Sequence, residues 1–105
     1  MHVRLSRFAG LPPERIEDTV REFKDESLQA LEQQPGFRGI TVGVNRKSGK
    51  ALAVTLWETE GDMRQSEKVA DEARAQAVST AKPEREPIVD DYEVVVSRLM
   101  DAAPQ

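Results

Sequence analysis

Residues 50–58 constrain the fold most, because this predicted strand carries apolar side chains on both of its faces. Successive side chains of a strand point to opposite faces of its sheet, so a strand with one wet face alternates between apolar and polar residues. The apolar residues here are Leu52, Val54 and Leu56 on one face, and Ala51, Ala53 and Trp57 on the other. This pattern favours a strand in the middle of a sheet that is covered on both sides.

Three further segments alternate as half-buried strands do. They span residues 2–8, 37–45 and about 88–99. In the first, Val3, Leu5 and Arg7 share one face, whereas Arg4, Ser6 and Phe8 share the other. Residues 45–49 separate the second strand from residues 50–58 and predict a hairpin loop.

Two segments have their apolar residues at helical spacing. The first runs from Pro13 to about Gln33 and ends at Pro35-Gly36, because proline cannot continue a helix and glycine tolerates the turn. The second runs to about Ala81, and Thr59 with Asp62 resembles a capping box at its start. Its inward stripe is thin, and all of its members except Met63 are small: Met63, Ser66, Ala70, Ala73 and Ala77.

The element order β-α-β-β-α-β predicts an α+β, ferredoxin-like fold, with a four-stranded antiparallel sheet and both helices on one face. The opposite face would then expose an apolar patch larger than soluble monomers usually tolerate. We therefore expect a homodimer in which two sheets pack face to face. The domain spans residues 1–99, and residues 100–105 form a C-terminal tail.

Composition excludes several classes of function. With no cysteine and His2 as the only histidine, the 105-residue chain offers no thiol nucleophile and no His-cluster metal site. Its net charge of −4 disfavours nucleic acid as a partner, which requires a cationic face. No apolar run reaches the ~20 residues that cross a membrane, and the N-terminus has no signal-peptide stretch, so we expect a cytoplasmic protein.

Three segments give the chain a family resemblance. They are Gln34-Pro35-Gly36-Phe37-Arg38-Gly39 after the first helix, Leu56-Trp57-Glu58-Thr59 at the end of the third strand, and Asp91-Tyr92-Glu93-Val94 in the last strand. In this order they resemble the antibiotic biosynthesis monooxygenase-like domains of the dimeric α+β barrel superfamily, over roughly residues 1–99. The resemblance implies the same fold, but such folds carry many functions.

The family includes cofactor-independent oxygenases of aromatic polyketide-type substrates, heme-degrading enzymes and proteins without known activity. The heme-degrading branch uses an asparagine on the first strand, with a tryptophan and a heme-binding histidine on the second helix. This chain has Ser6 and Arg7, Ser66 and Ala75 near those positions, so the resemblance does not extend to heme degradation. We expect no cofactor and no metal.

The small-residue stripe of the second helix leaves two alternatives. Either the helix packs closely against the sheet, as protein interiors generally do, or a cavity remains that would suit an aromatic ligand. In the family, the ligand pocket lies between sheet and helices, so the resemblance favours looking there.

Four residues are candidates for ligand binding: Arg7, Trp57, Ser66 and Tyr92. Each also has a structural interpretation, since Arg7 can extend to water at a strand end and the two aromatic rings can fill core volume. Alternatively, Arg7 points into the pocket and holds an anionic oxygen, Tyr92 donates to a carbonyl, and Ser66 adds a polar contact. No general base is identifiable, and the catalytic residues stay unknown.

Two functions are compatible with these features. The first is a cofactor-independent monooxygenase acting on a small aromatic or polyketide-type molecule, which binds, deprotonates and shields a carbanion that reacts with oxygen. The second is a non-catalytic dimer that binds a small ligand or serves as a scaffold. The missing base fits the second equally well.

Overall fold

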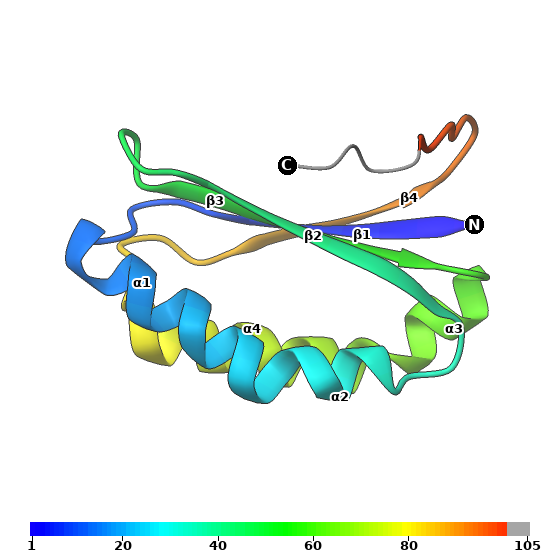
Figure 1. The fold of residues 1–105 in the computed structure, drawn as a ribbon, viewed down its shortest axis with the longest axis horizontal. Helices are drawn as coiled ribbons and strands as arrows, with labels where there is room; N and C mark the ends of the chain where they lie inside the picture. Colours follow the sequence, from blue (N-terminus) through cyan, green and yellow to red (C-terminus); the bar gives the residue numbers. More distant parts are fainter. Residues whose placement is uncertain (101–105) are drawn as a thin grey trace.

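A computed structural model describes residues 1–100, and it confirms the ferredoxin-like α+β fold (Figure 1). The sheet has four antiparallel strands in the order β2-β3-β1-β4. Within residues 1–100, all helices lie on one side of this sheet and none covers the other side, which we call the open face (Figure 1). The strands are β1 (His2–Phe8), β2 (Phe37–Asn45), β3 (Lys50–Trp57) and β4 (Ile88–Glu93).

The first helical segment is interrupted by a π-helical turn. It consists of α1 (Pro13–Glu22), the π turn η1 (Phe23–Ser27) and α2 (Leu28–Glu32). Pro13 stands in the first helical turn, where its missing N–H costs nothing. A π turn inserts an extra residue into the helical repeat and so rotates the side chains that follow. The spacing of apolar residues predicted a helix here but not the π turn.

The second helical segment is divided at Ser66 into α3 (Glu60–Gln65) and α4 (Glu67–Ala81). The predicted cap is confirmed, since the Thr59 hydroxyl accepts the Asp62 N–H at 3.0 Å. At the division, the backbone N–H of Ser66 is shared between the carbonyls of Asp62 and Met63. Ser66 is fully buried, so the division lies inside the molecule.

The corner between α2 and β2 depends on Gly36, whose φ of +76° lies in the left-handed region. A Cβ at this position would stand 2.1 Å from a carboxylate oxygen of Asp62 at the start of α3. The Gly36 carbonyl also accepts the Glu58 N–H at 2.8 Å. This corner therefore fixes the end of β3 and the start of α3 relative to each other.

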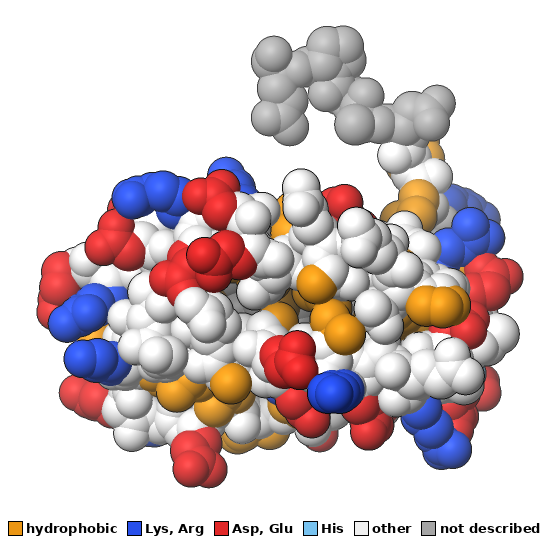
Figure 2. Space-filling model, turned by 90° about the horizontal axis from the view of Figure 1, so that it is seen from below, with side chains coloured by type: hydrophobic (Ala, Val, Ile, Leu, Met, Phe, Trp, Pro, Cys, Tyr) orange, Lys and Arg blue, Asp and Glu red, His pale blue; other side chains and the backbone are white. Residues whose placement is uncertain are grey.

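The hydrophobic core lies at the same end of the molecule as this corner. It contains Leu31, Trp57, Met63 and Ala70, with Phe37 packed against Trp57 edge to face at a centroid distance of 5.4 Å. At the other end, the space between helices and sheet is filled incompletely. The helix side of the molecule is accordingly hollowed near its middle, with hydrophobic side chains visible in the hollow (Figure 2).

The open face of the sheet carries an apolar patch. In the strand registers, Val3 lies beside Leu56 and Tyr92, and Leu52 and Ile88 on the same face are 41% and 56% exposed. These residues form what we call the open-face patch. No second chain is present in the structure, so the predicted dimer is taken up below as a proposal.

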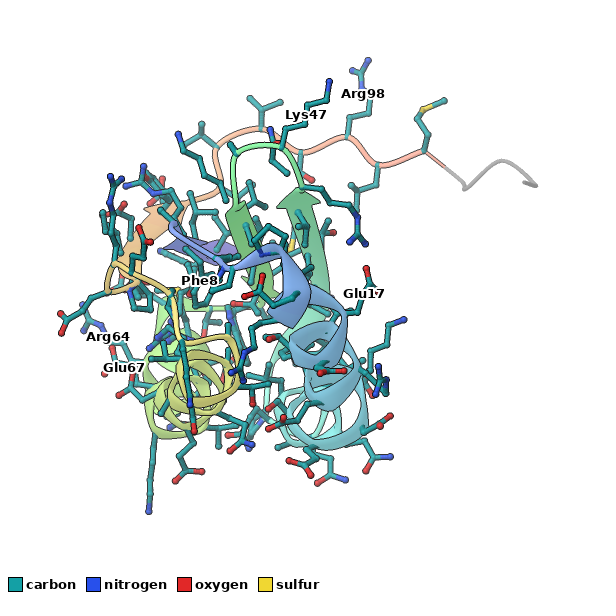
Figure 3. The ribbon with its side chains drawn as sticks, turned by 90° about the vertical axis from the view of Figure 1, so that its left-hand side faces the viewer. Phe8, Glu17, Lys47, Arg64, Glu67 and Arg98 are labelled. Carbon is teal, nitrogen blue, oxygen red and sulfur yellow. The ribbon has the colours of Figure 1, made fainter. Side chains whose placement is uncertain are left out.

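The last strand is shorter than predicted. It was expected to reach about Leu99, but β4 ends at Glu93, and Val94 to Met100 have no regular secondary structure. Its neighbour β1 begins at His2, and the last bond between the two segments runs from the Val94 N–H to the Met1 carbonyl. The residues after Val94 therefore have no part of β1 beside them to pair with. Residues 94–100 extend away from the helices, with Arg98 near their far end (Figure 3).

Residues 101–105, most of the predicted tail, lie outside the described part of the chain. Within residues 1–100, no helix combines the length and hydrophobicity needed to cross a membrane.

Candidate functional site

A cavity of about 580 Å³ lies between the sheet and the helices. Its size falls within the range of small-molecule sites, which is roughly 300–1,000 Å³. Of the two alternatives left by the small-residue stripe, the structure has the cavity. Phe8 lies in this space between the sheet and helix layers, whereas Glu17 and Glu67 on the helices point outward (Figure 3).

Small side chains keep the cavity open. On α4, Ala70, Ala73 and Ala77 line it at helical spacing, and on β3 Ala51 and Ala53 face them from the sheet. A methyl group cannot span the gap that a leucine or phenylalanine would fill. The remaining walls are mostly larger apolar side chains, including Phe8, Ile16, Val20, Phe23, Ile40 and Val44.

Arg4 is the most buried charged residue of the cavity wall, with 3% of its surface exposed. Its Nη1 donates to the Ser66 hydroxyl at 3.0 Å, and its Nη2 donates to the Met63 carbonyl at 2.6 Å. Both acceptors lie at the division between α3 and α4, where the Met63 carbonyl also accepts from the backbone N–H and the hydroxyl of Ser66. The broken helix thus holds the Arg4 guanidinium in place.

Burial lowers the pKa of Arg4 below its usual value, and this effect is opposed by the nearby carboxylate of Asp91. The Arg4 Nε lies 3.8 Å from an Asp91 oxygen. The guanidinium carbon also lies 5.9 Å from the centre of the Trp57 ring, within the distance of a cation–π contact. Arg4 is therefore a desolvated cation with the carboxylate of Asp91 beside it, and the charges of Glu67 and Asp71 also act on it.

A second guanidinium, that of Arg74 on α4, also lines the cavity. Its Nη1 donates to the Ser6 hydroxyl at 3.3 Å, across the space between helix and sheet. Its Nη2 pairs with Asp71, one turn back on the same helix. Arg4 and Ser6 share the helix-facing side of β1, so Arg74 contacts the same face of the strand from which the Arg4 side chain projects. The charge of Arg74 also lowers the pKa of Arg4, as neighbouring like charges do.

Trp57 and Ser66, two of the four candidate residues, lie behind Arg4 rather than on the cavity wall. Trp57 is fully buried, and its indole N–H donates to the Thr55 hydroxyl at 2.9 Å. The Ser66 hydroxyl accepts from Arg4 and donates to the Met63 carbonyl at 2.6 Å. Both residues hold the arginine that lines the cavity, so we treat them as positioning residues.

Arg7 and Tyr92, the other two candidates, lie on the open face of the sheet, away from the cavity. Arg7 is exposed and pairs with Asp90 at 3.0 Å, and Tyr92 is half exposed. The structure thus corrects the alternative that Arg7 points into the pocket. Ser6, on the opposite face of β1 from Arg7, lines the cavity. Alternation groups the side chains of β1 correctly but does not tell which face carries the helices.

Sequence reasoning missed Arg4 and Arg74. The sequence does hold a signal for each. Arg4 is a charged residue inside a strand, on the same face as Ser6 and Phe8. Arg74 is a charged residue next to the alanine stripe of the second helix. A charged residue beside an apolar stripe usually belongs to the solvated face of its helix. The side chain of Arg74 is only 16% exposed, because it bends from the edge of α4 toward Ser6.

The cavity wall has no acidic residue among the described part of the chain, although the protein is acidic overall. Its charged residues are Arg4, Lys24, Arg46 and Arg74. Nor do any three His, Asp or Glu side chains of residues 1–100 come close enough to hold a metal ion. The site therefore combines apolar walls with cationic groups.

No protein-family model matches the chain, and no curated protein is significantly similar in sequence. Solved structures do match. The monooxygenase ActVA-Orf6 of Streptomyces coelicolor, in complex with nanaomycin D, has a TM-score of 0.76 at 16% identity, covering 95% of this chain and 92% of its own. SnoaB, a cofactor-independent oxygenase from Streptomyces nogalater, has a TM-score of 0.66 at 14% identity, covering 91% and 94%.

A protein from Deinococcus radiodurans, provisionally classed as an antibiotic biosynthesis monooxygenase, has a TM-score of 0.70 at 17% identity, covering 97% of this chain and all of its own. The chain thus has the fold of antibiotic biosynthesis monooxygenase structures over nearly its full length. The resemblance noted in the sequence is confirmed at the level of fold, which at this identity does not extend to activity.

Proposed function

We propose that the protein is a cofactor-independent monooxygenase that acts on a small aromatic or polyketide-type substrate bound in the cavity. The observation that carries the proposal is the cavity itself, which has apolar walls and a buried guanidinium at Arg4. Flat aromatic rings suit such walls, and a guanidinium stabilises the enolate or phenolate oxygen of the ionised substrate. The shared fold is consistent with this chemistry.

The reaction would convert an anthrone-type methylene into a carbonyl. The substrate loses a proton to give a carbanion, which transfers electrons to O₂ and forms a hydroperoxide at the same carbon. Loss of water then leaves the new carbonyl, so one oxygen atom enters the product and the other leaves as water with the two methylene hydrogens. Carbon is oxidised, oxygen is reduced, and no further reductant is needed.

Arg4 would favour the first step by lowering the pKa of the bound substrate, because its cation lies in a desolvated position. Ser66 and Trp57 would hold the guanidinium in that position. No carboxylate or histidine of residues 1–100 lines the cavity, so the proton would pass to water. The shielded apolar walls would protect the carbanion from side reactions.

The second candidate function is ligand binding without turnover. The absence of a general base from the described cavity wall favours it specifically. The two functions share one site and differ in oxygen consumption. Incubation with anthrone and quinol substrates, followed by an oxygen electrode, separates them. The monooxygenase consumes one O₂ for each quinone formed and slows strongly in Arg4→Gln, whereas a binding protein gives no uptake above buffer.

We also propose that the protein forms a homodimer through the open-face patch. Leu52, Ile88 and Tyr92 are between 41% and 56% exposed there. Val95 and Val96, just after β4, are more than 80% exposed. Burying such a surface against a second copy removes apolar area from water, at roughly 25 cal/mol per Å².

A further inference from the structure

Two arginines face one cavity, and the carboxylates that act on Arg4 (Asp91, Glu67 and Asp71) are not part of the cavity wall. Arg4 is 3% exposed and the side chain of Arg74 is 16% exposed, so neither cation is fully hydrated. Their paired carboxylates, Asp91 and Asp71, are 45% and 70% exposed and stand outside the cavity wall. Solvent screens these carboxylates, whereas the cavity side of the two guanidinium groups meets apolar walls.

We infer that Arg4 and Arg74 together bind an anionic oxygen group of an aromatic ligand, either a carboxylate or an ionised phenol or enol. This inference rests on the proposed function in placing the ligand in the cavity, and it names the class of molecule accepted there. The aromatic part lies along the alanine stripe of α4, and the anionic group lies near Ser6 on β1.

Hydrogen-bonding capacity supports the assignment. A guanidinium has five N–H donors, and Arg4 uses one on each terminal nitrogen for Ser66 and Met63. Within residues 1–100 the second N–H of each terminal nitrogen makes no hydrogen bond. Arg74 likewise spends one terminal nitrogen on Ser6 and the other on Asp71. An anionic oxygen between the two groups would accept from both.

The mutual effect of the two charges agrees with this geometry. Arg4 and Arg74 are close enough for the charge of one to lower the pKa of the other. An anion between them converts this repulsion into two attractions. The other charged groups of the wall are Lys24 and Arg46, and Arg46 is paired with Glu17 on α1.

The test compares an anion with a neutral molecule of the same shape. Isothermal titration calorimetry with 1-naphthoate and 1-naphthamide measures both dissociation constants on the wild-type chain. We expect naphthoate to bind at least about tenfold more tightly, as a charge-assisted hydrogen bond inside a cavity permits. Equal affinities, or no binding of either probe, would overturn the inference.

Variants locate the anion. Arg74→Gln should bring the ratio of the two affinities close to one, whereas Arg21→Gln removes the same charge from an exposed position and should leave the ratio unchanged. Arg74→Lys keeps the charge without the planar fork and should give an intermediate ratio. An unchanged ratio in Arg74→Gln, with a wild-type circular dichroism spectrum, would contradict the assignment of Arg74.

A third probe separates carboxylate from phenolate. The affinity of 1-naphthol is measured below and above the pKa of the naphthol itself. If the affinity for naphthol rises when it ionises, the site accepts phenolates and enolates. If naphthoate binds tightly and the affinity for naphthol does not rise, the site accepts carboxylates alone. Anion selectivity without oxygen uptake would retain this inference and refute the monooxygenase. Oxygen uptake with equal binding of naphthoate and naphthamide would retain the monooxygenase and refute this inference.

Discussion

Ala77→Leu should stabilise the protein, because Ala77 on α4 borders empty space. The substitution adds three carbon atoms, and their burial is worth up to about 2.4 kcal/mol, at roughly 0.8 kcal/mol for each buried CH₂. Ordering the leucine side chain takes back about 0.5–1 kcal/mol, and the lower helix propensity of leucine takes back about 0.2 kcal/mol. The free energy of unfolding should therefore rise by up to about 1.2–1.7 kcal/mol.

Urea denaturation followed by the fluorescence of Trp57, the only tryptophan, measures this change at one fixed protein concentration. Ala75→Leu is the matched control, because Ala75 lies on the exposed side of the same helix and the leucine there buries little. In a closely packed interface, Ala77→Leu would instead cost about 1–3 kcal/mol through overpacking. A loss of stability of that size, with Ala75→Leu near neutral, would refute the cavity.

Two more predictions concern the support of Arg4 and the open-face patch. Ser66→Ala leaves an N–H of buried Arg4 without its acceptor and should lower the free energy of unfolding by about 1–3 kcal/mol. The control Ser79→Ala, at an exposed position, should change it by less than about 0.5 kcal/mol. Similar effects of the two substitutions in urea denaturation would contradict the positioning role of Ser66. Light scattering should give twice the 11.7 kDa chain mass for the wild type and the single mass for Leu52→Asp, and a monomeric wild type would refute the homodimer.

Much of the fold could be predicted from local patterns. Alternation and helical spacing gave the element order, and the Thr59 cap and the turn at Gly36 marked helix ends, because these signals depend on neighbouring residues only. The end of β4 was not predictable in this way. Residues 94–99 alternate like a strand, but a strand also needs a partner, and β1 supplies none beyond Met1.

The candidate site was predicted only in part. The alanine stripe indicated a possible cavity, and Ser66 and Trp57 proved to lie next to the buried arginine. Arg7 was considered in place of Arg4, because each occupies one of the two faces of β1 and alternation cannot tell which face the helices cover. Arg74 was missed because only the tertiary structure brings the edge of α4 near Ser6.

A crystal structure of the protein grown with 1-naphthoate tests the ligand site most directly. We predict electron density for the naphthalene ring between α4 and the sheet, with the carboxylate within hydrogen-bond distance of both Arg4 and Arg74. A helix layer closed onto the sheet with no space beside Ala73 and Ala77, or naphthoate bound elsewhere with the cavity empty, would contradict it.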